Sequence, residues 1–176
     1  MRLTLVEADP HSEAAQACLR AYYAELDQRL PGGFRVLASR DPQAADLRAP
    51  RGGFLIALAG SAPVGCLGLK GSGGPLAEIK RLWVSPTARG QGLGRRLMAA
   101  AEALARARGI TVLRLDTNAA LPEAAQLYRR CGWHEIPRFN DDPYATLFFE
   151  KAVPPADPLA AGPLAADPLA AARPDG

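Results

Sequence analysis

The chain of 176 residues is 48% hydrophobic and 22% charged, which is the composition of one soluble globular domain. The net charge is +3, and because residues 152–176 carry three Asp and one Arg, residues 1–151 carry +5. This mildly basic charge suits an anionic small ligand, although an ordinary solvated surface is an equally good explanation. No run of Lys and Arg with interleaved aromatic residues indicates nucleic-acid binding, and no apolar run is long enough to span a membrane.

The cysteines and histidines argue against two further classes of protein. Cys18, Cys66 and Cys131 are scattered and form no Cys-x-x-Cys pair, as expected in a reducing compartment. His11 and His134 are far apart and lack the spacing of metal ligands, so we expect no metal site. Because the N-terminus also lacks the apolar core of a signal peptide, we expect a cytoplasmic protein with no membrane partner.

The N-terminal part predicts a strand followed by a helix. Apolar and polar residues alternate from Leu3 to Glu7, as in a half-buried strand. Asp9, placed directly before a proline, predicts the N-cap of a helix. Apolar residues at helical spacing continue to Leu30, where Pro31-Gly32-Gly33 ends the helix. A weaker helical segment is predicted near Pro42 to Arg48.

The middle of the chain predicts three strands and a long helix. Two apolar runs flank Gly60-Ser61 and predict a hairpin, which a loop from Gly71 to Pro75 follows. Leu76 to Val84 is predicted to be the next strand. A glycine-rich loop then leads into a helix that we expect to end at about Arg108, before a glycine at the C-cap position.

The last part predicts a strand at Thr111 to Asp116, a helix at Pro122 to about Arg130, a strand at Trp133 to Ile136 and a closing strand at Thr146 to Lys151. This order of elements predicts a mixed α/β (α+β) domain with a central sheet over residues 1 to 151. Residues 152 to 176 consist mainly of Ala, Pro and Leu with a repeated Pro-Leu-Ala-Ala unit, which predicts a disordered tail.

The glycine-rich loop is the clearest functional signal. It directly precedes a helix, whose first N–H groups lack partners and carry partial positive charge, and glycines let an anion approach them. The loop therefore predicts a phosphate site. Two familiar phosphate loops do not fit, since Gly94 is followed by Arg95-Arg96 instead of Lys-Ser/Thr, and the third glycine of a dinucleotide fingerprint is missing. In the helix we expect the packed face to comprise Leu93, Leu97, Ala100 and Leu104.

A third pattern, Arg/Gln-x-x-Gly-x-Gly/Ala, fits the loop from Arg89 to Gly94 at every position. With AEIKRLWVSP before it and LRLDTN and AAQLYRRCGW after the helix, the sequence resembles the GNAT superfamily of N-acetyltransferases over residues 1 to 151. The resemblance implies the GNAT acyl-CoA N-acyltransferase fold, a central and mostly antiparallel sheet flanked by helices, with acetyl-CoA as acetyl donor. The plain alternative is a glycine turn that only enters a helix.

The resemblance also implies where acetyl-CoA would bind. Its pantetheine arm would take main-chain bonds at Leu82, Trp83 and Val84. Relatives often carry Asn at the position of Leu121, so Asn118, three residues earlier, is the substitute we consider. The pyrophosphate would sit on N–H groups of Arg89, Gly90, Gln91, Gly92, Leu93 and Gly94, with Arg89 or Arg95 adding charge.

Two residues are candidates for the chemistry. By resemblance, Tyr128 matches the tyrosine that faces the CoA sulfur, and its hydroxyl is protonated at neutral pH and can donate to a thiolate. The alternative is a packing residue. Glu78 matches a glutamate that some relatives use as general base, and a carboxylate among apolar strand neighbours is costly without a purpose. The alternative for Glu78 is a salt bridge with Lys80, Arg81 or a neighbouring strand.

Acceptor specificity in this family comes from the first helix and the loop before the last strand, here Pro137 to Ala145. In this loop acidic residues are candidates to hold a cationic amine and Arg138 a carboxylate, although Asp-Asp-Pro is equally an ordinary turn. Besides Glu25 of the first helix, the candidate substrate residues are Tyr22, Tyr23, Asn140, Asp141, Asp142 and Tyr144.

We therefore expect an N-acetyltransferase that acts on a primary amine of a small molecule or amino acid by direct attack in a ternary complex. No cysteine with a paired base falls beside the thioester site, which disfavours an acyl-cysteine route. The alternatives are a non-catalytic acyl-CoA-binding module and an acetyltransferase of protein N-termini or lysines. We expect a monomer or homodimer.

Overall fold

A computed structural model describes residues 2–38 and 46–155. One seven-stranded sheet with the order β1-β2-β3-β4-β5-β7-β6 forms its centre. All neighbouring strands are antiparallel except β4 and β5, which are parallel, so the predicted mostly antiparallel sheet is confirmed. In chain order the elements are β1 (Leu3–Glu7), α1 (Glu13–Arg29), a 3₁₀ turn (Val36–Ala38), β2 (Gly53–Ala59), β3 (Ala62–Gly71), β4 (Leu76–Val84), a second 3₁₀ turn (Pro86–Ala88), α2 (Leu93–Ala107), β5 (Val112–Thr117), α3 (Pro122–Arg130), β6 (His134–Glu135) and β7 (Leu147–Ala152).

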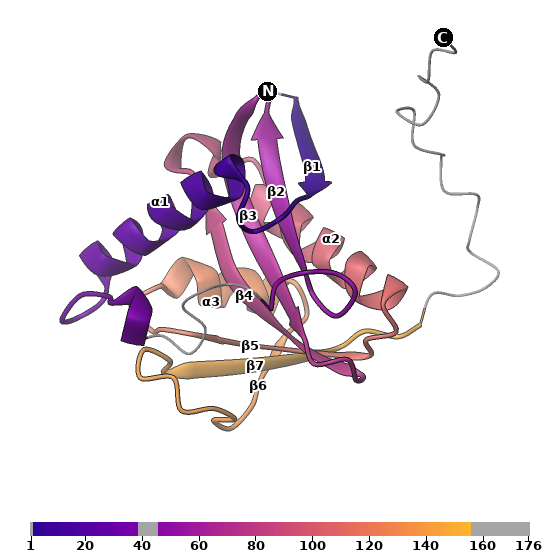
Figure 1. Cartoon of the computed structure of the whole chain (residues 1–176). Helices are drawn as coiled ribbons and strands as arrows, with labels where there is room; N and C mark the ends of the chain where they lie inside the picture. Colours follow the sequence, from indigo (N-terminus) through magenta and orange to yellow (C-terminus); the bar gives the residue numbers. More distant parts are fainter. Residues whose placement is uncertain (1, 39–45, 156–176) are drawn as a thin grey trace, which may run out of the picture.

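Helices cover both faces of the sheet, with α1 on one face and α2 and α3 on the other (Figure 1). Successive side chains of a strand point to opposite faces, so β2 supplies both layers. Leu55 and Ala57 pack with α2, whereas Phe54 and Ile56 pack with α1. β2 and the first part of β3 are therefore apolar on both sides, as the two unbroken runs in the sequence indicate.

The start of α1 differs from the prediction. Ser12 is the N-cap, and its side chain accepts a hydrogen bond from the Ala15 N–H. Asp9, predicted as the cap, instead accepts the His11 N–H at 2.7 Å and pairs with Arg48 at 2.9 Å. Two capping residues stand three positions apart here, and the tertiary contact with Arg48 selects which one turns the chain and which one starts the helix.

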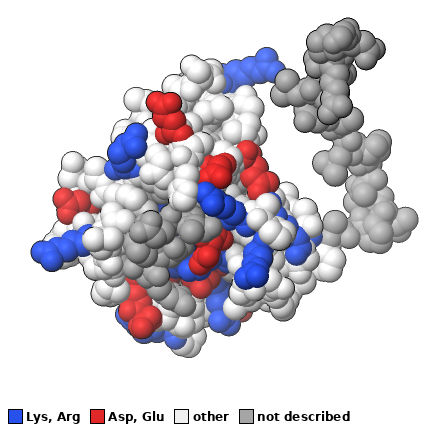
Figure 2. Space-filling view, in the orientation of Figure 1, with Lys and Arg blue, Asp and Glu red and all other residues white. Residues whose placement is uncertain are grey.

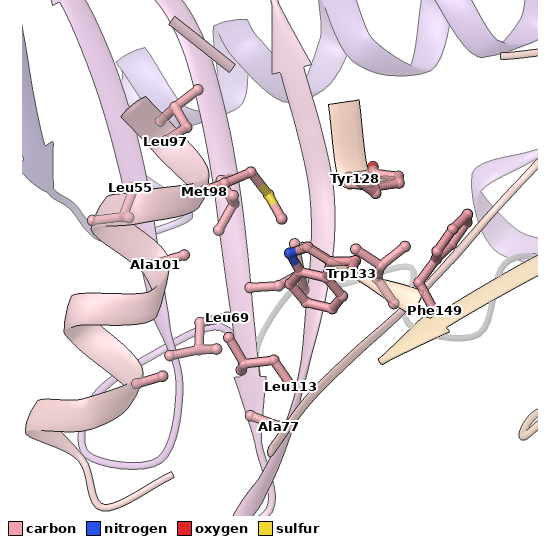
Figure 3. Packing of buried hydrophobic residues seen from close by; sticks show 14 of the residues in the cluster. Leu55, Leu69, Ala77, Leu97, Met98, Ala101, Leu113, Tyr128, Trp133 and Phe149 are labelled. Carbon is pink, nitrogen blue, oxygen red and sulfur yellow. The ribbon is translucent and has the colours of Figure 1, made fainter. Parts of the chain in front are cut away.

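The packed face of α2 is rotated from the predicted one. Leu93 and Leu97 are buried as predicted, but Ala100 and Leu104 are only partly buried at the edge of the cluster. Figure 3 shows Leu97, Met98 and Ala101 of α2 lying toward the sheet strands. Glu102 also lies on the buried face, because Lys151 donates to its carboxylate at 2.6 Å. A carboxylate that is paired with a cation is compatible with a packed face, which hydrophobicity alone does not reveal.

The C-terminal strands also depart slightly from the expected bounds. β6 has two residues where four were predicted, and Trp133 before it is buried in the core beside Tyr128. β7 runs to Ala152, and Val153 is 1% exposed with its N–H bonded to the Thr111 carbonyl. The packed part of the chain therefore extends past residue 151. Most of the predicted segment Pro42 to Arg48, and most of the predicted tail, lie outside the described residues.

β4 and β5 diverge along their length, and the candidate site lies in the opening between them. They pair only at Leu76–Val112, Ala77–Leu113 and Glu78–Arg114, and beyond that point β4 continues to Val84 and β5 to Thr117 (Figure 1). A bulge accompanies the separation, because two steps along β3 from Gly68 to Cys66 face three along β4 from Lys80 to Trp83. Arg81 adopts φ 54° there, the only positive value at a described non-glycine residue.

Candidate active site

Two neighbouring cavities occupy the opening between β4 and β5. The first, a groove of about 590 Å³, lies between α1, the end of β4, the loop before α2 and α3. The second, a pocket of about 120 Å³, lies between α1, the middle of β4, the end of β5 and the loop before β7. Below they are called the groove and the pocket. Residues that line both include Tyr22 of α1 and Leu121 before α3, so the two cavities adjoin.

The glycine loop forms one end of the groove. Gly90 and Gly92 have φ of 75° and 74°, a backbone region that costs other residues energy, and the space beside each Cα is open. Arg96 donates the first helical hydrogen bond of α2, to the Gly92 carbonyl at 3.1 Å. The N–H groups of the three residues before it consequently have no acceptor within the helix. A ring of main-chain donors at a helix N-terminus faces the groove.

Gly94 differs from the other two glycines. A Cβ atom there would lie 2.9 Å from Cδ2 of Leu127, closer than ordinary contact allows. Because glycine has no Cβ atom, α2 and α3 can approach each other closely at the groove. The three glycines that the sequence presents as one motif thus serve two needs, turn geometry at Gly90 and Gly92 and helix–helix approach at Gly94.

Arg89 lines the groove but already has partners. Its Nε donates to the Val84 carbonyl at 2.9 Å, and its Nη2 lies 2.6 Å from Glu25 of α1. Glu25 also accepts the Trp83 indole N–H at 3.0 Å and pairs with Arg29 at 3.2 Å. Arg29 in turn forms an ion pair with Glu123 at the start of α3. A chain of four charged side chains therefore lines the groove from the glycine loop to α3.

Most of the predicted donor-binding residues come together in the groove. The exposed Gln91 and the amide of Asn118 lie elsewhere: Gln91 bonds the Thr87 carbonyl, and Asn118 lines the pocket. Both ends of the Asn118 amide are engaged, by the Tyr144 carbonyl at 2.7 Å and the Ala120 N–H at 2.8 Å. Lining the groove are Leu82, Trp83, Val84, Arg89, Gly90, Gly92, Leu93, Gly94 and Arg95.

Tyr128 lies in the wall of the pocket and is only 6% exposed. Burial, reinforced by the nearby Asp116 carboxylate, raises the pKa of its hydroxyl well above the usual range. Its ring lies beside Trp133 and Phe149 in the core (Figure 3). Tyr128 therefore combines a packing role with a neutral hydroxyl that can only donate or accept a hydrogen bond at ordinary pH.

Glu78 is separated from Tyr128 by a lysine. Its carboxylate lies 3.1 Å from the Lys80 ammonium, which lies 2.6 Å from Asp116 on the other side. Asp116 and Lys80 line the pocket, whereas Glu78 lines a different depression beside Lys70 and Arg51. The attraction of the two carboxylates outweighs burial and raises the pKa of Lys80. Glu78 thus takes part in a salt bridge, the alternative considered for it, and its role as a base stays a prediction.

Aromatic rings from α1 and two loops form the outer wall of the pocket. Tyr23 stacks on Phe34 at 5.7 Å, and Phe34 contacts Tyr144 at 4.6 Å between ring centroids. Arg81 donates from Nε to the Tyr23 hydroxyl at 2.8 Å, so the strained bulge residue is held against α1. Tyr22 lines the pocket as well. The three tyrosines predicted for the acceptor side thus line one pocket, and their role in binding stays a prediction. Phe34 was missed because it follows a helix-ending glycine pair.

The loop before β7 supplies fewer pocket residues than predicted. Asp142 and Tyr144 line the pocket, Asn140 reaches it by donating to Asp116 at 2.6 Å, and Asp141 is exposed outside both cavities. Arg138, considered for a substrate carboxylate, donates to the Ala145 carbonyl at 2.8 Å and to two other carbonyls of the same loop. It therefore fixes the shape of the loop instead of facing a ligand.

Asp116 and Lys80 were also missed as pocket residues. Their signal is present in the sequence, since Asp116 ends a predicted strand and Lys80 sits in the strand before the glycine loop. Only the separation of β4 from β5 shows that both face one cavity. Within residues 2–38 and 46–155, no cluster of three His, Cys, Asp or Glu side chains is arranged to hold a metal ion.

Acidic and basic side chains are interspersed on the face shown in Figure 2. No helix among the described residues combines the length and apolar character that crossing a membrane requires.

The chain is similar in sequence and in fold to known proteins. The sequence model of the acetyltransferase (GNAT) family matches residues 14–133. A protein of Azospirillum brasilense named "IAA acetyltransferase" is 38% identical over 104 residues, which cover 56% of this chain and 66%, just under two thirds, of that protein.

Solved structures resemble the fold as a whole. One from Klebsiella pneumoniae, provisionally named an acyl-CoA N-acyltransferase, is 28% identical with a TM-score of 0.70 and covers 86% of this chain and 97% of its own. A GNAT-family acetyltransferase from Staphylococcus aureus has a TM-score of 0.75 at 16% identity, covering 87% of this chain and 100% of its own, which is a likeness of fold alone.

Proposed function

The chain belongs to the GNAT acetyltransferase family and is an acyltransferase, and we propose that it transfers the acetyl group of acetyl-CoA to a primary amine of a small molecule or amino acid. The observation that carries the proposal is the pair of adjoining cavities. The groove ends on main-chain donors at a helix N-terminus, and the pocket holds Tyr128 and a buried carboxylate. Family members generally use acetyl-CoA, whose diphosphate suits that end of the groove.

The residues of the groove fit this donor. The open space beside Gly90 and Gly92 admits a diphosphate to the N–H groups of α2, and Arg95 adds positive charge. β4 beyond Glu78 no longer pairs with β5, so its edge toward the opening is available for main-chain bonds to an amide-bearing chain. One main-chain acceptor of β4, the Val84 carbonyl, is already engaged by Arg89.

In the pocket the chain would position the acceptor amine and stabilise the charges that develop during acetyl transfer. When bound, acetyl-CoA supplies an acetyl group activated as a thioester. Asp116 offers a carboxylate to an incoming ammonium, which must lose a proton before its nitrogen can attack. The Tyr128 hydroxyl stays protonated and can donate a hydrogen bond to the leaving sulfur. The small volume of about 120 Å³ and the aromatic wall favour a compact acceptor.

The test is a panel of amines in which CoA release is followed with a thiol reagent. Amino acids, small alkylamines and aromatic amines are compared with peptides that carry a free N-terminus or a lysine. We expect turnover with at least one small amine and little with the peptides. Turnover confined to peptides would identify a protein acetyltransferase, and acetyl-CoA binding by calorimetry without any turnover would identify a non-catalytic module.

A further inference from the structure

Among residues 2–38 and 46–155, a single polar side chain lies at the junction between the groove and the pocket. Five residues line both cavities, and four of them are aliphatic. If the donor occupies the groove and the acceptor occupies the pocket, the reacting atoms meet at this junction. A group that acts on them must reach it. The five residues are Tyr22, Leu26, Leu82, Leu121 and Ala124.

Tyr22, on α1, lines both cavities at this junction. Its ring lies 5.4 Å from that of Tyr23, which is engaged by Arg81, while the Tyr22 hydroxyl has no hydrogen-bond partner within the described part of the chain. Tyr128 lies close enough to raise the pKa of Tyr22 electrostatically. Tyrosines from two different helices thus lie at the proposed reaction site. Tyr128 lines the pocket alone, and Tyr22 lines both cavities.

The Tyr22 hydroxyl remains neutral at all ordinary pH values. Burial, and secondly the neighbouring Tyr128, raise its pKa far above that of a free tyrosine. It can therefore act as a hydrogen-bond donor but not as a base. A neutral donor that has no protein acceptor and borders a thioester site is suited to an oxygen on which negative charge develops.

We propose that Tyr22 is a second catalytic hydroxyl, which donates a hydrogen bond to the acyl oxygen while Tyr128 serves the sulfur. The proposal rests on the proposed function of the same site. A bond forms between the amine nitrogen and the acyl carbon, and the carbon–sulfur bond breaks. The acceptor ammonium first releases one proton to water, the second proton that its nitrogen loses ends on the sulfur, and the Tyr22 hydroxyl keeps its own proton throughout.

The test is Tyr22→Phe, which removes the hydroxyl and keeps the ring that packs on Tyr23. We expect kcat to fall about 10²-fold, the usual loss of one donor to a developing oxyanion. The affinity for CoA, measured by calorimetry, and the melting temperature should stay as in the wild type. The pH profile of kcat should keep its shape, because a hydroxyl that does not titrate cannot move its limbs.

A second variant guards against a purely structural effect. Tyr22→Met keeps an apolar side chain at the junction without a donor and should lower kcat to the same extent, so that a Met variant with wild-type kcat would overturn the proposal. Unchanged kcat in Tyr22→Phe, or a loss that appears in CoA affinity alone, would overturn it as well. If the wild-type protein turns over no amine at all, the proposed function fails instead.

Discussion

Glu25 on α1 and Arg89 on the loop before α2 form an ion pair with 2.6 Å between carboxylate oxygen and guanidinium nitrogen. This pair joins the helix that lines the pocket to the loop that ends the groove. If a diphosphate binds in the groove as proposed, this carboxylate repels it and occupies the arginine that would attract it. The contact would then oppose donor binding while it holds α1 in place.

Glu25→Gln should consequently bind acetyl-CoA more tightly. Removing about 1 kcal/mol of repulsion corresponds to a gain of roughly 5-fold in affinity. The gain should shrink at high salt, because screening weakens the same repulsion. Calorimetry at low and high ionic strength measures both effects. Glu135→Gln, which breaks an exposed ion pair outside both cavities, is the matched control, and weaker binding by Glu25→Gln would contradict the argument.

Gly92→Asp and Gly92→Asn test the phosphate loop as a pair. Asp and Asn tolerate positive φ better than other side chains, have nearly the same shape and meet open space at this position. Both variants should fold with similar melting temperatures. The charged Asp variant should lose acetyl-CoA binding at least 10-fold more than the Asn variant, because about 1.4 kcal/mol of repulsion gives that factor. Equal losses would show that charge at the loop is irrelevant.

Gly94→Ala should affect the groove more than the fold. Alanine is worth up to about 1 kcal/mol more than glycine within a helix, which offsets the displacement of the Leu127 side chain. The displaced Leu127 enters the groove, so acetyl-CoA affinity should fall while the free energy of unfolding changes by less than about 1 kcal/mol. The double variant with Leu127→Ala should regain affinity. A double variant no better than Gly94→Ala would point to a direct role of the glycine.

Asp116→Asn should weaken the acceptor and spare the donor. The pocket would lose the negative charge that faces a cationic amine, so KM for the amine should rise at least 10-fold, whereas calorimetry should give an unchanged acetyl-CoA affinity. Asp141→Asn is the control, since Asp141 is exposed outside both cavities. Equal KM values for the two variants would remove Asp116 from the acceptor site.

Alkaline pH should destabilise the protein through its buried tyrosines. The folded-state pKa of Tyr22 and of Tyr128 is raised above that of an unfolded chain, so only the unfolded state loses these protons near pH ~10. The contribution of these two hydroxyls to the free energy of unfolding is fully present below pH ~10 and is lost as the pH rises further. Melting curves from pH 8 to 11 should therefore decline more steeply for the wild type than for Tyr22→Phe/Tyr128→Phe. Identical slopes would show that neither hydroxyl is shielded.

Periodicity predicted the order and type of the elements well, because long apolar faces leave few alternatives. α3 was predicted with the bounds that the structure has. Periodicity is less informative about the position of single residues. Asp9 and Ser12 are equally good caps by composition, and a tertiary contact with Arg48 decides between them. Ala100 was placed on the packed face of α2, whereas Glu102 is buried there because Lys151 neutralises it.

The sequence by itself determined the glycine loop and the helix that follows it, since glycines, a following helix and their spacing are local properties of one continuous segment. Only the tertiary structure decided which residues share the reacting space. The separation of β4 from β5 places Asp116 in the wall of the pocket, whereas Glu78 lies outside the pocket and pairs with Lys80. The approach of α1 brings Tyr22 to the border of both cavities. Such meetings depend on strand divergence and helix docking between distant segments, and no local pattern encodes them.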